Sequence, residues 1–195
     1  MENEVKRCSW VDLKSPVYVE YHDKEWGVPV YDDQKLYEIF LLETFQAGLS
    51  WITILKKRQE FEKAFDSFDV EKIAVYDEKK IEELMENKGI IRNRRKITAA
   101  IKNAAIFIEI QKEFGSFSKY LWGFTDGKII LNTKDDFPVK TELSDAVSED
   151  LIKRGMGFVG SVTIYSYLQA IGIVNDHSLD CFCRKTKNTH NEAVK

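Results

Sequence analysis

The chain has 195 residues, a formal net charge of -3 and a sequence pI of about 5.7, so its overall charge does not mark a nucleic-acid-binding protein. Hydrophobic residues make up 44% of it, which is enough for one buried core. Three cysteines and the lack of an apolar stretch of signal-peptide or membrane length predict a cytoplasmic protein with no membrane partner. No coiled-coil seam is present, so we expect a monomer.

Apolar residues recur at helical spacing along most of the chain, which predicts an all-α protein. The first predicted helix is capped by Asp32 and Asp33 and ends at Gly48, and the second starts at Ser50 and runs through Phe61. Further helices are predicted at residues 69–75, 78–87, 93–114, 116–122, 144–154 and 160–172. We expect one compact domain of two helical lobes over residues 1–183.

Two segments lack this spacing. Residues 128–141 contain Ile129, Ile130 and Leu131 followed by a charged, proline-containing stretch, which predicts a loop that includes at most a short hairpin. Residues 184–195 have no apolar periodicity and predict a loose C-terminal tail.

Metal-ligand residues occur as two half-sites at opposite ends of the chain. Cys8 and His22 lie near the start, and His177 and Cys181 are spaced so that both ligand atoms reach one ion. Thiolate and imidazole suit zinc, and four protein ligands leave no open position for water, which predicts one structural ion and disfavours a zinc hydrolase. The alternative is that the cysteines are buried small hydrophobes. Cys183 could also replace Cys181 as a ligand.

A glycine-rich segment at residues 154–161 lies between two predicted helices. Such a turn exposes backbone N–H groups, and these groups together with the positive end of the next helix can bind a phosphate oxygen without many basic side chains. The alternative is a plain connection between helices.

Basic residues form three short clusters, each of which is typical of a solvated helix face. A role in DNA binding requires the fold to bring them together. The clusters are Lys56, Lys57 and Arg58; Arg92, Arg94, Arg95 and Lys96; and Lys153 and Arg154.

A group of five aromatic residues, four of them in a short N-terminal region, is mixed with charged residues and not with aliphatic ones. Its members are Trp10, Tyr18, Tyr21, Trp26 and Trp51. Aromatic rings usually belong to a core, but this pattern also suits a partly polar pocket in which a base could stack. Glu43 lies on the apolar side of its helix, where it either forms a salt bridge or serves as a hydrogen-bond acceptor inside a pocket.

Six ordered motifs occur between residues 6 and 183, and together they resemble the DNA-3-methyladenine glycosylase I family. They are CSW at residues 8–10, YHDKEWGVP at 21–29, QAGLSW at 46–51, GIIR at 89–92, FVG at 158–160 and VNDH at 174–177. The resemblance implies a helix-hairpin-helix DNA glycosylase fold with a zinc site that joins the N- and C-terminal segments. It also implies removal of 3-methyladenine from alkylated double-stranded DNA in base excision repair, without strand cleavage and without a nucleotide cofactor.

The resemblance also assigns roles to residues. The implied zinc ligands are Cys8, His22, His177 and Cys181. The implied base pocket contains Glu43 as the catalytic residue, with Tyr21 and Trp51 against the base and Trp10, Tyr18 and Trp26 around them. The implied DNA-binding hairpin covers residues 155–160 and includes Gly155, Gly157, Phe158, Val159 and Gly160, followed by Ser161. Asp176 is expected to be structural or to support the zinc site, and not to act as a general base.

Two positions depart from the family pattern. Phe45 stands where relatives tend to have a polar residue, which predicts a narrower or drier pocket. Gly157 stands where a lysine commonly precedes the phenylalanine, which predicts one phosphate contact fewer and weaker DNA binding. A non-catalytic, zinc-stabilised DNA-binding module is the alternative function.

Overall fold

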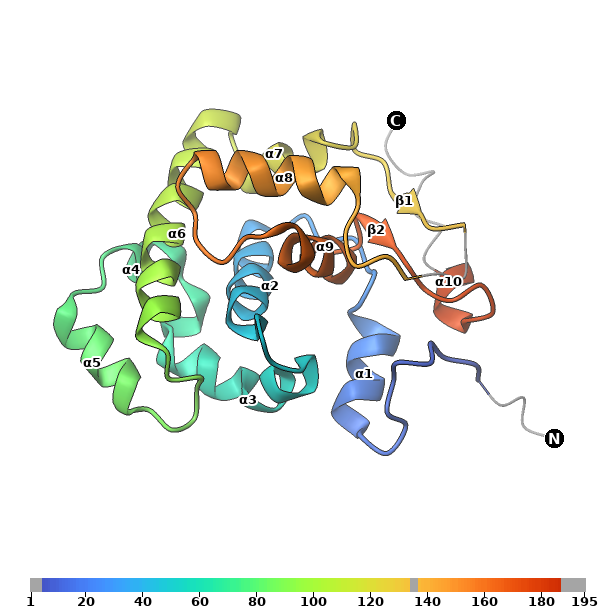
Figure 1. Cartoon of the computed structure of the whole chain (residues 1–195), viewed down its shortest axis with the longest axis horizontal. Coiled ribbons are helices and arrows are strands. Elements are labelled where there is room, and N and C mark those ends of the chain that lie inside the picture. Colours follow the sequence, from blue (N-terminus) through green and yellow to red (C-terminus); the bar gives the residue numbers. More distant parts are fainter. Residues whose placement is uncertain (1–4, 134–136, 187–195) are drawn as a thin grey trace.

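A computed structural model describes residues 5–133 and 137–186, and this part of the chain is mostly helical (Figure 1). No helix within these two ranges is long and apolar enough to cross a membrane. The elements in chain order are α1 (Pro16–Lys24), α2 (Asp33–Gln46), α3 (Trp51–Ala64), a short 3-10 helix (Asp66–Phe68), α4 (Val70–Ala74), α5 (Glu78–Glu86), α6 (Arg94–Phe114), α7 (Phe117–Gly123), β1 (Ile130–Leu131), α8 (Glu142–Lys153), α9 (Ser161–Ala170), β2 (Val174–Asn175) and α10 (Phe182–Thr186).

Helix α2 lies at the centre of the core and is buried on almost every side, because α3, α6, α7 and α9 all pack against it. Its start agrees with the prediction, since the Asp32 side chain accepts from the Lys35 backbone N–H at 2.8 Å. Asp33 then accepts the backbone N–H groups of Phe117 and Ser118 at the start of α7. Helix α2 ends at Gln46 and not at the predicted Gly48.

The helices predicted from α3 to α9 are confirmed, with ends that differ by a few residues. Helices α1 and α10 were not predicted. The described part of residues 128–141 is a loop, as predicted, with one short strand. That strand, β1, does not pair within a local hairpin but with β2 in parallel, with Ile130 opposite Val174. A local pattern carries no signal for a partner strand so distant in the sequence.

The N-terminal segment and α10 lie at the same end of the molecule (Figure 1), where the Phe182 backbone N–H donates to the Lys6 carbonyl at 2.9 Å. The first residues of the predicted tail belong to α10, and the Arg184 guanidinium donates to the carbonyls of His177 and Asn132. The remainder of that tail, residues 187–195, lies outside the described residues.

Candidate functional site

A cavity of about 380 Å³ opens beside α2, a size that suits a small organic ligand. All six residues that the sequence assigned to a base pocket line it. The lining consists of Ser9, Trp10, Tyr18, Tyr21, Trp26, Glu43, Gln46, Trp51, Phe137, Pro138, Ser166 and Gln169. The cavity therefore joins side chains from the N-terminal segment, α1, α2, α3 and α9.

Glu43 projects into this cavity from the buried helix α2, and its side chain is only 4% exposed. None of the described residues gives its carboxyl group a hydrogen bond or an ion pair, so the salt-bridge alternative is not observed. Burial raises the pKa of this carboxyl to about 8 because the charged form loses its water. The group is thus free to bind a ligand and is largely protonated at neutral pH.

The aromatic side chains form two walls. Tyr21 and Trp51 make one wall, with ring centroids 5.4 Å apart and planes inclined at 51°. Trp10 makes the other with Tyr18 and Trp26, at centroid distances of 5.2 and 4.9 Å. The first pair is in direct contact, so a base can stack against this wall but does not fit between its two rings, which would need about 7 Å.

Sequence reasoning missed the polar side chains that α9 contributes to the pocket, Ser166 and Gln169. The Gln169 amide nitrogen donates to the buried Asp176 carboxylate at 2.6 Å, and the Tyr165 hydroxyl donates to the same oxygen. Asp176 thus holds the pocket wall and does not line the pocket, in agreement with its expected structural role. The spacing of Ser166 and Gln169 on one face of an apolar helix was the available signal.

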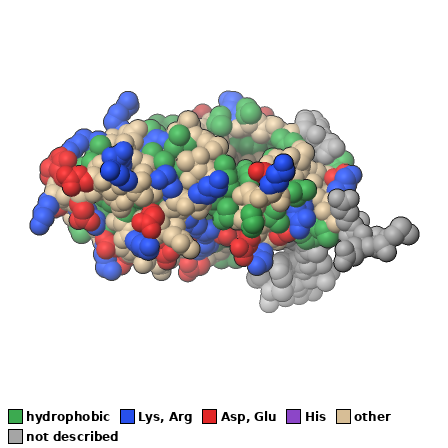
Figure 2. All heavy atoms as spheres, turned by 90° about the horizontal axis from the view of Figure 1, so that it is seen from below, with side chains coloured by type: hydrophobic (Ala, Val, Ile, Leu, Met, Phe, Trp, Pro, Cys, Tyr) green, Lys and Arg blue, Asp and Glu red, His purple; other side chains and the backbone are tan. Residues whose placement is uncertain are grey.

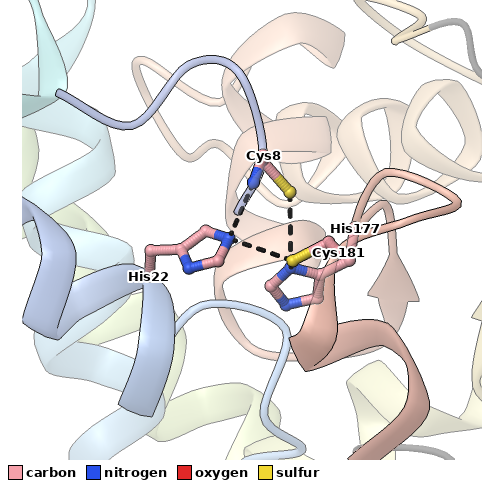
Figure 3. A group of neighbouring side chains, drawn as sticks. All are labelled: Cys8, His22, His177 and Cys181. Carbon is pink, nitrogen blue, oxygen red and sulfur yellow. Dashed lines mark hydrogen bonds between the residues drawn. The ribbon is translucent and has the colours of Figure 1, made fainter. Parts of the chain in front are cut away.

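The four predicted metal-ligand residues lie together, buried, at the junction of the chain ends (Figure 3). Cys181 Sγ lies 3.5 Å from both His22 Nε2 and His177 Nδ1, and Cys8 Sγ lies 3.5 Å from His177 Nδ1. Sulfur and nitrogen ligands of one tetrahedral zinc ion are also separated by about 3.5 Å, given ordinary zinc–ligand distances. These separations are compatible with a metal ion held by the four side chains.

The outer nitrogens of the two histidines have acceptors. His22 Nδ1 donates to the Asp23 carboxylate at 2.8 Å, and His177 Nε2 donates to the Trp26 carbonyl at 3.1 Å. In its neutral form, each histidine therefore turns an unprotonated nitrogen toward the centre of the cluster, which is the tautomer that a metal ion requires. Cys183 lies behind His22, 3.9 Å from Nδ1, so Cys181 and not Cys183 completes the group of four.

The metal-ligand cluster lies directly behind the aromatic wall of the pocket. The Trp10 ring packs on His22 at 5.3 Å, and the Trp26 ring packs on His177 at 4.6 Å. Gly27 allows the close approach of His177, because a Cβ added at position 27 would stand 3.1 Å from His177 Nε2. The backbone of Gly27 also has a φ of +72°, which favours glycine. The orientation of two pocket tryptophans thus depends on the cluster.

The predicted glycine-rich turn connects α8 to α9, and its backbone donors are only partly free. The N–H groups of Gly155 and Met156 bond to carbonyls at the end of α8, and that of Gly157 donates to Asn103 Oδ1 at 2.8 Å. The N–H groups of Phe158, Val159 and Gly160 have no acceptor within the part of the chain that the structure describes. The backbone donors without an internal acceptor therefore lie at 158–160, before the uncapped start of α9.

The three predicted basic clusters are largely occupied by internal contacts. Arg58 pairs with Glu25 and Glu38, Arg94 with Glu78 and Glu82, and Arg154 with Glu113 and Asp150. Lys57 donates to the carbonyls of Lys88 and Gly89, and Lys96 is buried. Figure 2 shows basic and acidic side chains interspersed on the face seen there. Lys56, Arg92, Arg95 and Lys153 remain exposed.

Phe45 does not face the pocket. Its ring packs against Phe61 and Phe65 at centroid distances of 4.9 and 5.6 Å, and it is fully buried. The predicted narrowing of the pocket by this residue is therefore wrong, because the side chain points to the opposite side of α2.

Comparisons with known proteins agree with this geometry. The family model described as methyladenine glycosylase matches residues 10–184. The chain belongs to the methyladenine glycosylase family. It is 46% identical over 181 residues to DNA-3-methyladenine glycosylase of Haemophilus influenzae, an alignment that covers 91% of this chain and 97% of the relative.

Solved structures of methyladenine glycosylases have the same fold. A crystal structure of 3-methyladenine DNA glycosylase I superposes with a TM-score of 0.88 at 45% identity and covers 91% of this chain and 99% of that one. A variant of 3-methyladenine DNA glycosylase I in complex with 3-methyladenine superposes with a TM-score of 0.85 at 37% identity, covering 88% and 94% of the two chains. Membership of this family makes the protein a glycosylase of base excision repair.

Proposed function

We propose that the protein hydrolyses the N-glycosidic bond of 3-methyladenine in alkylated duplex DNA and binds the extruded base in the pocket beside α2. The observation that supports this most directly is a buried, unpaired carboxyl group, Glu43, next to the wall of Tyr21 and Trp51. A carboxyl in this setting suits a ligand that is flat, positively charged and a hydrogen-bond donor.

Recognition follows from the chemistry of the damaged base. Alkylation at N3 makes adenine cationic in DNA, so the rings of Tyr21 and Trp51 attract it by stacking and cation–π interaction, each contributing on the order of 1 kcal/mol. The Glu43 carboxylate accepts a hydrogen bond from the adenine amino group. A guanine would place O6, a second acceptor, against the same carboxylate, which disfavours it.

Binding and ionisation are coupled at Glu43. The empty pocket favours the neutral acid, whose pKa is about 8, and a bound cation favours the carboxylate. The charge that develops on Glu43 therefore balances the positive base in a site that excludes water, where such a pair interacts strongly.

Bond cleavage requires little acid catalysis because the cationic base is already a good leaving group. The bond between C1′ and N9 breaks with its electron pair moving to the base, which leaves as neutral 3-methyladenine. Water then forms a bond to C1′ and releases a proton to solvent. The product is an abasic site with an intact phosphodiester backbone. Extrusion of a damaged, poorly paired nucleotide from the duplex also requires less free energy than extrusion of a normal one.

DNA contact is proposed at the turn between α8 and α9. The N–H groups of Phe158, Val159 and Gly160, at the positive end of α9, would bind a backbone phosphate. Gly155, Gly157 and Ser161 would shape this turn, with Gly155 at a φ of +99° that favours glycine.

We propose that the cluster of Cys8, His22, His177 and Cys181 binds one zinc ion per chain with a structural role. The burial, the 3.5 Å separations and the histidine tautomers support this assignment. A zinc ion held by four side chains would tie the ends of the chain together, and every step of base excision above is carried out without it.

We also propose that the protein acts as a monomer in the cytoplasm. None of its three cysteines forms a disulfide, a state that a reducing compartment maintains. Light scattering at micromolar concentration and fractionation of cells would check the two parts separately.

The test of the function is to incubate the purified protein with methylated duplex DNA and identify released bases by chromatography. We expect release of 3-methyladenine without strand cleavage, and loss of release in Glu43→Ala and Trp51→Ala variants that still fold. Stable binding of the duplex with no released base would instead favour a DNA-binding module.

A further inference from the structure

Lys96 is a buried lysine at the start of α6, with a side chain that is only 6% exposed. Its ammonium donates to two carbonyls at the end of α2, those of Phe45 and Ala47, at 2.7 Å each. These carbonyls belong to the turn that leads from Glu43 on α2 to Trp51 on α3. Lys96 therefore supports the chain segment between two pocket residues.

The same ammonium lies over the ring of Phe158, 5.7 Å from its centroid. Phe158 belongs to the turn between α8 and α9 and has a φ of +60°, which is unfavourable for a phenylalanine and requires support from neighbouring residues. One side chain thus contacts both the segment that shapes the pocket and the turn proposed to bind DNA.

Two further residues on the same face of α6 support this turn. Asn103 donates to the Gly157 carbonyl at 3.0 Å and accepts from the Gly157 N–H at 2.8 Å, and it is buried. Ala99 lies so close to Gly157 that a Cβ added to the glycine would stand 3.2 Å from the alanine Cβ. The positions 96, 99 and 103 follow helical spacing, so α6 acts as a rigid support between pocket and turn.

Burial of an ammonium group between two helices carries a desolvation penalty. No carboxylate pairs with Lys96 among the residues described, so only carbonyl oxygens and the negative end of α2 balance its charge. An apolar side chain of similar length could fill the space at lower cost. The presence of a cation at this position is explained if its hydrogen bonds to the two carbonyls are needed for the reaction.

We propose that Lys96 is a positioning residue that fixes the turn at residues 154–160 relative to the base pocket. DNA held at this turn would then place an extruded nucleotide correctly in the pocket. The inference rests on the proposed function. It assigns Lys96 no contact with the base, so the residue should affect excision from DNA much more than binding of the free base.

The experiment compares Lys96→Met, Phe158→Leu and the double variant by two measurements. One is the single-turnover rate of 3-methyladenine release from methylated duplex, and the other is the dissociation constant of free 3-methyladenine from tryptophan fluorescence. We expect Lys96→Met to slow release by about 10- to 100-fold, because a shift of about 1 Å has effects of this size. The free base should bind within about threefold of wild type.

Phe158→Leu removes the ring but retains the two carbonyl bonds, so it should show a smaller loss of the same kind, about tenfold or less. The double variant should be about as slow as Lys96→Met alone, because both changes break one connection. Lys112→Met is the matched control, since Lys112 is an exposed lysine on the same helix. It should behave as wild type in both measurements.

Several outcomes would overturn the inference: unchanged release in Lys96→Met, a parallel loss of free-base binding, or multiplicative effects in the double variant. If Lys96→Met unfolds at the assay temperature, Phe158→Leu decides alone, and equal changes in its two measurements would count against the proposal. A wild-type protein that releases no 3-methyladenine would refute the proposed function itself, so the two failures are distinguishable.

Discussion

Glu43 shows how a buried, unpaired carboxyl group can lower the stability of a protein. Its pKa is raised by burial from 4.5 to about 8, so the unfolded chain releases this proton at a lower pH than the folded protein. Between these values the folded state binds more protons than the unfolded state, and its stability falls as pH rises. Above pH 8 both states are ionised and the penalty stays constant.

Replacement of this acid should therefore stabilise the protein while it impairs the reaction. At pH 7 we expect Glu43→Gln to raise the free energy of unfolding by up to about 3 kcal/mol, and at pH 4.5 by close to zero. Denaturant unfolding at both pH values would check this. Glu38→Gln is a useful control, because that carboxylate is paired with Arg58 and Lys35 and its loss should destabilise. Equal stability of Glu43→Gln and wild type at pH 7 would contradict the account.

At this scale the sequence was informative where residue types are unusual for their surroundings. A lone carboxylate among apolar residues and tryptophans among charges indicated the pocket, and the family resemblance supplied their roles. Gln169 and Ser166 were missed because a glutamine and a serine on a helix are ordinary residues. Only the fold shows that Asp176 fixes the orientation of the Gln169 amide beside the pocket. The side on which Phe45 packs also depends on tertiary contacts, with Phe61 and Phe65.

At the scale of elements, the turn between α8 and α9 combines one glycine that is required with another that is replaceable. Gly155 has a φ of +99°, whereas Gly157 has a backbone conformation open to other residues. A side chain at 157 needs only a small shift of Ala99, since the added Cβ would lie 3.2 Å from the alanine Cβ. The lysine that is common in the family at this position can therefore be introduced in place of Gly157.

We expect Gly157→Lys to strengthen DNA binding by one phosphate contact. The slope of log K against log salt concentration should become steeper by about 0.9, which is the contribution of one released counterion. Binding of a fluorescent duplex at several salt concentrations would measure it. Gly157→Gln adds a side chain of comparable reach without charge, and it should leave the slope unchanged. If Gly157→Lys and the wild type had the same slope, position 157 would lie away from the DNA backbone.

Helices α2 to α9 could be predicted because each is specified locally, by apolar spacing and by caps such as Asp32. The pairing of Ile130 with Val174 could not, since two-residue strands have no periodicity and their pairing depends on the whole fold. Helix α1 mixes aromatic and charged residues because one side of it lines the pocket, and this use obscures the usual amphipathic pattern.

At the scale of the whole molecule, the cluster of cysteines and histidines supports both the fold and the pocket. Trp10 and Trp26 pack on His22 and His177, so loss of a bound metal should weaken the aromatic wall. We expect a chelator to lower the melting temperature by several degrees and to weaken binding of free 3-methyladenine, while duplex binding at the distant turn declines less.

Cysteine variants distinguish the effect of losing the metal from the effect of losing a buried side chain. Cys181→Ala should reproduce the effect of the chelator and reduce the zinc content measured by elemental analysis. Cys183→Ala, which removes a buried thiol outside the group of four, should retain zinc and lose about 1 kcal/mol of stability at most. A chelator that alters neither melting nor binding would argue against a structural metal.

With a metal ion bound, this cluster would give the chain the topology of a closed ring. Cys8 and His177 are 169 residues apart, so a metal bound between them would close almost the entire polypeptide into one loop. Chain statistics assign such a closure about 5 kcal/mol of lost entropy in the unfolded state, as for a disulfide of equal span. A pulling force applied at the two ends would be carried by the metal–ligand bonds, and the helices between them would bear no tension until those bonds broke.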